Sequence, residues 1–503
     1  MAHFSTFIPT SSYQRYYHVN HFAKIAKTRP TTMTNMSTVS EHTLLEMNFQ
    51  AMRSAYSRDP APDYAQRIAV LKKLKRALVN HEQQIYQALS EDYGYRSEFD
   101  TFFADIMPTI ATINYAIKHL KKWMQPAKRH AGLMLAPSKV KVHYQPLGVV
   151  GVVTPWNFPF YLALGPTVQA LAAGNRVMIK MSEFTPAANQ VLRTVLDDIS
   201  DHVHLVEGDA DIGAAFTALP FDHLIFTGST SVGKLVAKAA ADNLTPITLE
   251  LGGKSPTIID QDIDMKVAVD AVIMGKSINS GQICVAPDYV FVPTSRLDSF
   301  IDTFIARYTE YHLQSANKNQ QSHIISQRQH TRLLQLLDDA KAKGAVVHAV
   351  KQPEPGDGKR VYPHLLTNLS DDMAVLKEEI FGSLLPVMIY DTLDEVISYI
   401  TARHRPLALY IMSNNSALIE RLITHTHSGG VSINDTTMHV VADDAPFGGI
   451  GHSGMGHYHG YEGFLTFSKA KTVLYSSSWL PKNRFVLKHR DWVLKVLRKY
   501  LLR

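Results

Sequence analysis

Three side chains of complementary chemistry stand in this 503-residue chain where apolar segments give way to polar turns. Cys284, the single cysteine, ends the small-residue segment Asn279-Ser280-Gly281-Gln282-Ile283-Cys284. Glu250 precedes a Gly-Gly turn, and Asn157 follows the apolar run 147–153. A thiol, a carboxylate and a side-chain amide can serve as the nucleophile, the base for water and the oxyanion donor of acyl chemistry. The three residues therefore indicate a covalent catalytic site.

A structural role is the alternative for Cys284. A lone thiol cannot form an intrachain disulfide, and a free cysteine most often behaves as a small buried hydrophobe. Glu250 stands 34 positions upstream, and both it and Asn157 follow strand-like runs, where a side chain becomes accessible at the end of a sheet. The presence of these two groups favours the chemical role.

The elements that must position these groups follow from the pattern of apolar residues. From residue 149 onward, apolar runs alternate with helical periods: the runs cover 149–153, 177–180 and 223–226, and the helical periods cover 166–173, 187–199 and 231–243. This alternation predicts a parallel, doubly wound sheet. The pattern repeats after residue 253, with runs that include 289–293 and 385–390. We therefore predict an α/β fold with at least two domains, preceded by a helical region over 63–89.

The charge of the chain is concentrated at its two ends. The formal net charge is +6, but residues 1–40 carry +4 and residues 482–503 carry +7, so the segment between them carries −5 by the same count. A body of this charge excludes nucleic-acid binding as the main function. No run of 18 or more apolar residues occurs, so we predict no segment that spans a bilayer.

The two ends have different compositions. Residues 1–40 lack both an acidic residue and the compact apolar stretch of a secretory signal, so we expect a disordered extension, with Met33 or Met36 as the working initiator. Together with the single cysteine, this favours a cytoplasmic location. Residues 482–503 carry apolar residues at helical spacing between lysines, which predicts a basic amphipathic helix. This helix could lie on an anionic membrane surface, or it could pack on its own or a partner subunit.

Further motifs complete the pattern. They are Pro155-Trp156-Asn157, Phe226-Thr227-Gly228-Ser229, Glu250-Leu251-Gly252-Gly253-Lys254, Gly281-Gln282-Ile283-Cys284, Glu378-Glu379-Ile380-Phe381-Gly382 and Pro446-Phe447-Gly448-Gly449. With these motifs in this order, the chain resembles the aldehyde dehydrogenase superfamily from about residue 41 to 478. Within it, the segments 219–228, 284–289 and 457–464 look most like the coniferyl aldehyde dehydrogenase branch.

The resemblance implies an activity and a role for each catalytic residue. The enzyme would oxidise an aldehyde to its carboxylic acid with NAD, or alternatively NADP, through a thiohemiacetal and a thioester on Cys284. The substrate would be aromatic, such as coniferyl aldehyde, or a medium- to long-chain aliphatic aldehyde. The Asn157 amide and the Cys284 backbone N–H would hold the oxyanion, and Glu250 would activate water.

The resemblance also implies a set of cofactor contacts. Gly228, Ser229 and Gly233 would meet the pyrophosphate at the start of a helix. Lys180 and Glu183 would hold the adenosine ribose, and a carboxylate there favours free hydroxyls and hence NAD. Met181 replaces the usual proline in this loop. The remaining expected contacts are Glu379 at the nicotinamide ribose, Phe381 beside the ring, and Trp156, Leu251 and Gly252.

The resemblance implies three domains. Residues 41–135 and 150–251 would bind NAD(P), residues 252–435 would form the catalytic domain, and residues 136–149 and 436–481 would form a bridging domain. Two strands of that last domain, over 139–144 and 471–475, would extend from the body and join a second subunit, with a homodimer favoured.

Two rival functions remain beside this one. An acylating enzyme of the same fold would pass the thioester to coenzyme A or phosphate, but Glu250 counts against it as a base for water. A non-catalytic structural or binding protein would have no use for Cys284, Glu250 and Asn157 together.

The histidines near the C-terminal glycine-rich turns do not suggest a metal site. No cysteine or carboxylate joins His439, His452, His457 and His459 at ligand spacing, so we assign them to loops or to a substrate channel. Residues 458–464, with several aromatic side chains, are expected to line the substrate entrance or a subunit contact.

Overall fold

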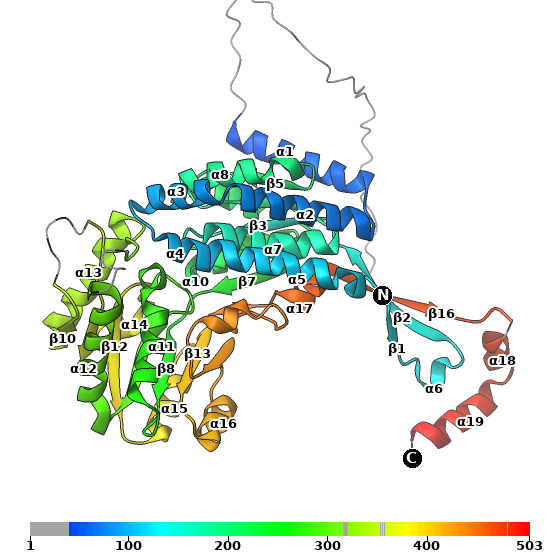
Figure 1. Cartoon of the computed structure of the whole chain (residues 1–503). Helices are drawn as coiled ribbons and strands as arrows, with labels where there is room; N and C mark the ends of the chain where they lie inside the picture. Colours follow the sequence, from blue (N-terminus) through cyan, green and yellow to red (C-terminus); the bar gives the residue numbers. More distant parts are fainter. Residues whose placement is uncertain are drawn as a thin grey trace, which may run out of the picture. The chain divides into compact units, whose positions relative to one another are not determined.

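The computed structural model describes residues 40–502, apart from 315–319, 353, 355, 357 and 480 (Figure 1). The expected N-terminal extension, residues 1–40, lies outside this part except for its last residue. Within the described part, the strands form three sheets, of six, seven and three strands. No helix among these residues is long and apolar enough to cross a bilayer. The predicted fold class, with two doubly wound sheets and a small third sheet, is confirmed.

The six-stranded sheet has the order β15-β7-β6-β3-β4-β5 and is parallel except for β15. Its strands are β3 (Val149–Val153), β4 (Arg176–Lys180), β5 (Val203–Val206), β6 (His223–Gly228), β7 (Ile247–Leu251) and β15 (Gly454–Met455). The chain moves outward from β3 to β4 and β5 and then returns to the other side of β3 as β6. The winding therefore reverses between β3 and β6, and open α/β sheets bind ligands at the carboxyl ends of strands at such a point.

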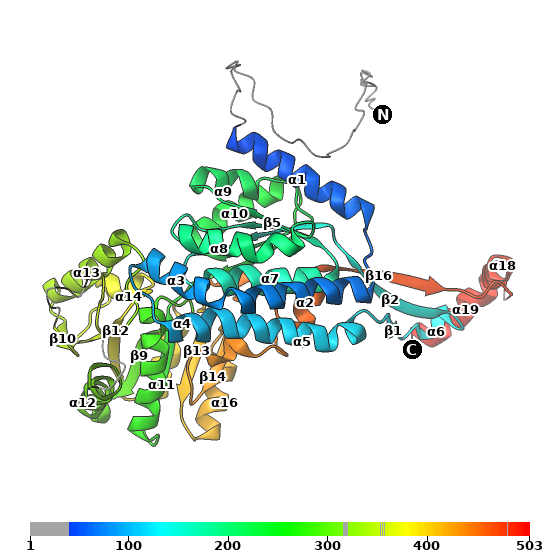
Figure 2. The same ribbon diagram turned by 45° about the horizontal axis from the view of Figure 1, so that its top comes forward.

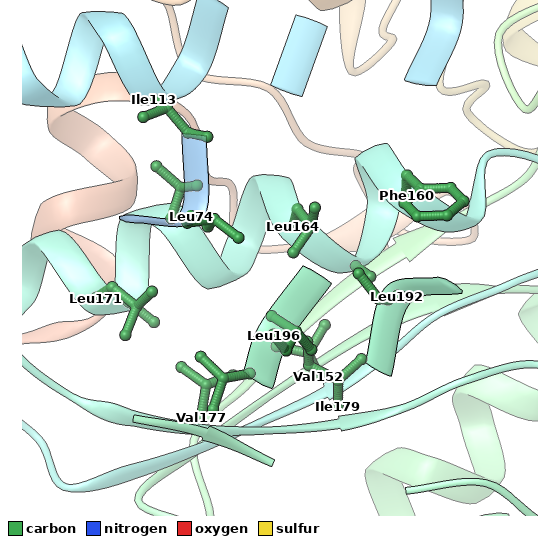
Figure 3. Close-up of a cluster of buried hydrophobic side chains, with 14 of the residues drawn as sticks. Leu74, Ile113, Val152, Phe160, Leu164, Leu171, Val177, Ile179, Leu192 and Leu196 are labelled. Carbon is green, nitrogen blue, oxygen red and sulfur yellow. The ribbon is translucent and has the colours of Figure 1, made fainter. Parts of the chain in front are cut away.

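Helices cover both faces of this sheet (Figure 2). One face packs against α2 (Tyr64–Asn80), α5 (Met107–Trp123), α7 (Pro159–Ala173) and α8 (Pro186–Leu196), and the other against α1 (Glu41–Arg58), α9 (Ala210–Thr217) and α10 (Thr230–Asp242). Figure 3 shows the first layer, where side chains of these helices meet Val152, Val177 and Ile179 of the sheet. Burial on both faces explains why these strands read as continuous apolar runs.

The region predicted to be helical over 63–89 forms two helices. They are α2 and α3 (Glu82–Tyr93), which meet at His81. The Nδ1 atom of the His81 ring lies 2.7 Å from the backbone oxygen of Ala77, where α2 ends. The backbone of His81, with φ −106° and ψ 14°, departs from helical geometry and separates the two helices.

The seven-stranded sheet has the order β10-β11-β12-β9-β8-β13-β14 and is parallel except for β10. Its strands are β8 (Ser255–Ile259), β9 (Pro287–Pro293), β10 (Val346–Ala349), β11 (His364–Thr367), β12 (Leu384–Tyr390), β13 (Ala408–Met412) and β14 (Gly430–Ile433). One face packs against α11 (Met265–Ser277) and α12 (Leu297–Tyr308), the other against α15 (Leu393–Thr401) and α16 (Ser416–His425), and α13 (Gln327–Ala342) covers the β11 end. This sheet carries the loop of Cys284 between α11 and β9.

The remaining helices are short connections. They are α4 (Glu98–Thr101), η1 (Phe102–Ile106), α6 (Gly132–Leu135), η2 (Asp197–Ile199), η3 (Ile278–Gly281), η4 (Thr294–Arg296), η5 (Thr309–Gln314), α14 (Ala374–Lys377), η6 (Met438–Val441) and α17 (Gly460–Thr466). Of these, η1 is a π-helical turn, a conformation that is frequent at functional sites.

The three-stranded antiparallel sheet has the order β1-β2-β16. Its strands are β1 (Ala127–Arg129), β2 (Lys139–Pro146) and β16 (Ser468–Tyr475), so the strands predicted over 139–144 and 471–475 are confirmed and are longer. The region 436–481, expected as a whole in the bridging domain, divides between sheets. Its strand β15 joins the six-stranded sheet, where Gly454 pairs with Glu250 of β7. Only β16 of this region joins the three-stranded sheet.

The C-terminal segment predicted as one helix over 482–503 forms two, which corrects that prediction. They are α18 (Lys482–Lys488) and α19 (Arg490–Leu501), separated at His489. The Phe485 and Trp492 rings lie edge to face with centroids 5.8 Å apart. Seven positions span about 10 Å along a continuous helix, so the break at His489 lets these rings meet. No residue of either helix is buried.

Candidate active site

Cys284 lies at the end of a loop with an unusual backbone. Asn279, Ser280 and Gly281 all have positive φ, at 47°, 55° and 73°, a conformation that disfavours non-glycine residues. A Cβ on Gly281 would lie 2.5 Å from the backbone oxygen of Gly382, so only glycine fits there. The Asn279 backbone N–H donates to Asp100 over 3.1 Å. Such strain persists where surrounding contacts hold it, most often at functional sites.

Glu250 is the fourth residue of β7, and its carboxyl group is buried without a partner. Only 3% of its surface is exposed, and neither carboxylate oxygen has a hydrogen-bond partner in the described part of the chain. Burial raises the pKa of Glu250 well above its ordinary value, because the charged form loses its hydration. A carboxyl group in this state can take a proton at a higher pH than an exposed glutamate can.

Asn157 lies in the loop after β3 and is held by both its side chain and its backbone. Its Nδ2 donates to the Gln282 backbone oxygen over 3.1 Å, which leaves its second amide N–H for a ligand. Its backbone oxygen accepts hydrogen bonds from Arg96 Nη1 at 2.8 Å and from the Tyr93 hydroxyl at 3.2 Å. These contacts fix the amide beside the Cys284 loop.

The three predicted catalytic residues line one cavity of about 230 Å³. The same cavity is lined by further predicted site residues: Trp156, Gly228, Ser229, Gly252, Glu379 and Phe381. Gly252 approaches Glu379 so closely that a Cβ at position 252 would overlap the Glu379 carboxylate. The Phe381 ring meets the Trp156 ring edge to face, with centroids 5.3 Å apart. The motifs that were far apart in the sequence therefore converge here.

A second cleft, of about 610 Å³, adjoins this cavity at the switch point between β3 and β6. Lys180, Glu183, Gly228 and Ser229 line it, and the N-terminus of α10 begins directly after Ser229. The volume is within the range of cofactor pockets, and the helix N-terminus favours an anionic group. These residues fit a dinucleotide whose pyrophosphate lies at α10.

Two residues that were expected to contact the cofactor do not line either cavity. They are Gly233 and Leu251, and a Cβ on Gly233 would come within 2.6 Å of the Leu251 side chain. Gly233 therefore lets α10 pack closely on β7. Lys180 lines the cleft, but its Nζ already donates to the backbone oxygens of Met181 and Gly208, at 2.8 and 2.7 Å.

A third cavity, of about 80 Å³, reaches Cys284 from another side and is almost entirely apolar. It is lined by side chains of η1, of α7 and its preceding loop, and of the segment after β14, among them Phe103, Phe158, Tyr161, Leu162, Val440, Phe447, Tyr458 and His459. Cys284 and Leu162 line both this cavity and the one that holds Glu250. The thiol therefore lies where an apolar ligand and a dinucleotide can meet.

Comparison with known proteins identifies the family. The chain matches the profile described as "Aldehyde dehydrogenase family" over residues 17–473. The chain belongs to the aldehyde dehydrogenase family. It is 51% identical to a "Probable coniferyl aldehyde dehydrogenase" from Pseudomonas aeruginosa, over 85% of this chain and 90% of that protein, and 43% identical to a "Coniferyl aldehyde dehydrogenase" from a Pseudomonas species, over 85% and 89%. The chain is therefore an enzyme that oxidises aldehydes with a nicotinamide cofactor.

Solved structures agree with this assignment. A substrate-bound Staphylococcus aureus AldH aligns with a TM-score of 0.82 and 35% identity, covering 87% of this chain and 95% of that one. A betaine aldehyde dehydrogenase from Staphylococcus aureus, solved in complex with NAD+, aligns with a TM-score of 0.78 and 26% identity, covering 86% and 88%.

The electrostatics of this aldehyde dehydrogenase keep its thiol protonated at rest. Burial raises the pKa of Cys284 to about 12, and the nearby carboxylates of Glu379 and Glu250 add to the effect. Burial and then the Asp288 carboxylate raise the pKa of Glu379 to about 8. The thiol must therefore lose its proton as it attacks, and the two glutamates are the nearby groups that can carry a proton.

Sequence reasoning missed several residues of the site. Arg332 lines the catalytic cavity and donates to the backbone oxygens of Glu379 and Ile380, at 3.1 and 2.5 Å. Tyr161 stands in the first turn of α7, directly after the loop of Asn157, and no local sequence signal marks it as a site residue. Of residues 458–464, only Tyr458 and His459 line the apolar cavity.

Proposed function

We propose that this aldehyde dehydrogenase oxidises aromatic aldehydes of the coniferyl aldehyde class to their carboxylic acids, with NAD as its preferred cofactor. The apolar cavity that ends at Cys284 carries the proposal, since its aromatic walls suit a flat apolar substrate. The names of the relatives at 51% and 43% identity support the same substrate class. An aliphatic aldehyde is the second candidate, because the lining is almost wholly apolar.

In the first half of the reaction, Cys284 Sγ bonds to the aldehyde carbon, and the carbonyl electron pair moves to the oxygen. We assign the Asn157 amide N–H and the Cys284 backbone N–H as the donors that stabilise this oxyanion, whose charge develops only during the attack. The thiol proton leaves to the Glu250 carboxylate, directly or through water. A bound nicotinamide would supply the acceptor for the hydride that leaves this carbon, and the carbon would then be a thioester of Cys284.

In the second half, water attacks the thioester. Glu250, after it has released the thiol proton to solvent, takes a proton from that water and returns it to the departing Cys284 sulfur, while Asn157 again holds the oxyanion and the acid is released. Glu250 lines the cavity beside Cys284, which supports this role and counts against an acylating enzyme that uses coenzyme A or phosphate. At the nucleotide end, Glu183 and the free donor of Lys180 would hold the ribose hydroxyls, which favours NAD over NADP.

The oligomer that we propose is a homodimer joined through the three-stranded sheet. β16 pairs only with β2 in the described part of the chain, and most of its eight residues are exposed. A long exposed edge strand is a ready site for pairing with another chain. Sedimentation equilibrium tests this proposal, and a monomer at micromolar concentration would contradict it.

We also propose that α18 and α19 bind an anionic membrane surface. Neither helix has a buried residue, and Phe485, Trp492 and Leu501 are at least 48% exposed. Eight basic residues and one Asp occur in 482–503, which suits anionic lipid better than a subunit surface.

An NADH-absorbance assay tests the function. Coniferyl aldehyde, benzaldehyde and decanal are compared as substrates, with NAD and with NADP. We expect the highest kcat/KM for coniferyl aldehyde with NAD. A higher kcat/KM for decanal than for both aromatic aldehydes would favour the aliphatic candidate.

A further inference from the structure

The apolar cavity contains one hydrogen-bonded pair of polar side chains, Tyr161 and His459. The Tyr161 hydroxyl lies 3.3 Å from His459 Nε2, and the two residues are 298 positions apart in the chain. Only 8% of Tyr161 and 4% of His459 are exposed. Both side chains line the cavity that ends at Cys284. Burying polar groups in an apolar cavity lowers stability unless each group has a hydrogen-bond partner.

The pair has hydrogen-bonding capacity to spare. The Tyr161 hydroxyl can also donate to the Val440 backbone oxygen, but only at 3.5 Å, and it is hydrogen-bonded to the Thr112 side chain, so one of its acceptor positions stays open. No other described residue forms a hydrogen bond with the second ring nitrogen of His459, Nδ1. Burial lowers the pKa of His459 to about 3, so the ring is neutral and carries one N–H. Whichever nitrogen holds the proton, Nδ1 remains as a donor or an acceptor.

The backbone at His459 is also held in an unusual conformation. Its φ of 112° lies in a region that residues with a side chain rarely adopt. The Phe447 ring stacks on the imidazole with centroids 5.3 Å apart and planes 19° apart, which fixes the orientation of the ring. Strain of this kind is kept where the position of a side chain matters.

We propose that Tyr161 and His459 determine substrate specificity by binding an oxygen substituent on the aromatic ring of the aldehyde, such as a phenolic hydroxyl. The inference rests on the proposed function, because it assumes an aromatic substrate. A phenolic hydroxyl both donates and accepts, so it matches either tautomer of the pair.

The test compares two aldehydes that differ only in the ring hydroxyl, cinnamaldehyde and 4-hydroxycinnamaldehyde. We expect the native enzyme to have the higher kcat/KM for the hydroxylated aldehyde. In Tyr161→Phe, which removes one oxygen atom, the ratio of the two kcat/KM values should fall about tenfold, as for the loss of one buried hydrogen bond. His459→Asn, which tolerates positive φ better than most residues, should lower the same ratio.

Tyr390→Phe is the matched control. Its hydroxyl donates to the Ile259 backbone oxygen over 2.7 Å in the seven-stranded sheet, away from the cavity, so the ratio should not change. Equal losses for both aldehydes in the Tyr161 and His459 variants, or an unchanged ratio, would overturn the inference. A native enzyme that oxidises neither aldehyde would instead overturn the proposed function. One that oxidises both with the same kcat/KM would overturn only the role of Tyr161 and His459.

Discussion

Arg96 donates to the backbone oxygen of Asn157 over 2.8 Å, so a buried guanidinium group holds the residue that we propose as the oxyanion donor. The same guanidinium pairs with Asp105 at 2.7 Å, and neither side chain is exposed. Asp105 in turn accepts the backbone N–H groups of Phe160 and Tyr161, at 3.0 and 3.2 Å. One ion pair therefore ties the Asn157 loop to the first turn of α7.

Arg96→Met should lower both stability and catalysis. Removing one partner of a buried ion pair leaves Asp105 uncompensated, which costs about 3–5 kcal/mol of unfolding free energy. Urea denaturation measures this loss. Arg307→Met is the control, because Arg307 and Asp270 are 25% and 37% exposed and a solvent-screened pair contributes far less than a buried one. Similar losses in the two variants would argue against the positioning role of Arg96.

Cys284→Ala should abolish aldehyde oxidation while NAD binding is retained. The thiol lies in the Cys284 loop, whereas the cleft at α10 is built from β3, β4 and β6 with their following loops. An NADH-absorbance assay measures aldehyde oxidation, and titration of the protein with NAD measures cofactor binding. Residual oxidation within about tenfold of the native rate, a barrier change of about 1.4 kcal/mol, would assign the nucleophile to another group.

Glu250→Gln should give rapid formation of one equivalent of NADH followed by slow turnover. Hydrolysis of the thioester needs a base for water, and an amide cannot take that proton. In the native enzyme, the steady-state rate should rise with pH as Glu250 ionises, because its raised pKa keeps it protonated at lower pH. This limb of the pH profile should disappear in Glu250→Gln and persist in Glu379→Gln. A native-like steady state in Glu250→Gln would place the base elsewhere.

Glu379→Gln should raise stability more at pH 8 than at pH 4.5. The folded pKa of Glu379 is raised from about 4.5 to about 8, so the unfolded chain ionises this group first as pH rises. Its contribution to stability is therefore present below pH 4.5 and is lost between about pH 4.5 and 8. A glutamine has nearly the same shape and does not titrate. Thermal unfolding of both proteins at several pH values measures the difference, and a difference that does not vary with pH would contradict the raised pKa.

Deletion of residues 482–503 should remove binding to anionic vesicles and leave benzaldehyde oxidation intact. The intact protein should sediment with phosphatidylserine vesicles at low salt and be released at high salt, because exposed charges are screened. Phosphatidylcholine vesicles are the control for charge. If no intact protein binds at low salt, and the deletion instead lowers thermal stability, the two helices pack on a subunit.

The sequence by itself determined which residues we assign to the chemistry. Cys284, Glu250, Asn157 and Glu379 could be selected because each follows or ends a recognisable local signal, a strand end or a turn rich in glycine. The α/β class followed for the same reason, since alternating strands and helices are encoded locally. Carboxyl ends of parallel strands meet at one edge, so the convergence of Glu250 and Asn157, which lie at the ends of strands of one sheet, needed no knowledge of packing.

Only the tertiary structure decided how these groups are held and what the apolar cavity can recognise. Arg96, Asp105 and Arg332 act on backbone atoms of other segments, and no local pattern marks a side chain for that. The pair of Tyr161 and His459 depends on how α7 and the loop before α17 pack against each other. Their distance, the burial that keeps the imidazole neutral and the spare hydrogen-bonding capacity arise from contacts between segments nearly 300 positions apart. Long-range packing sets those properties, whereas the local sequence sets only the residue types.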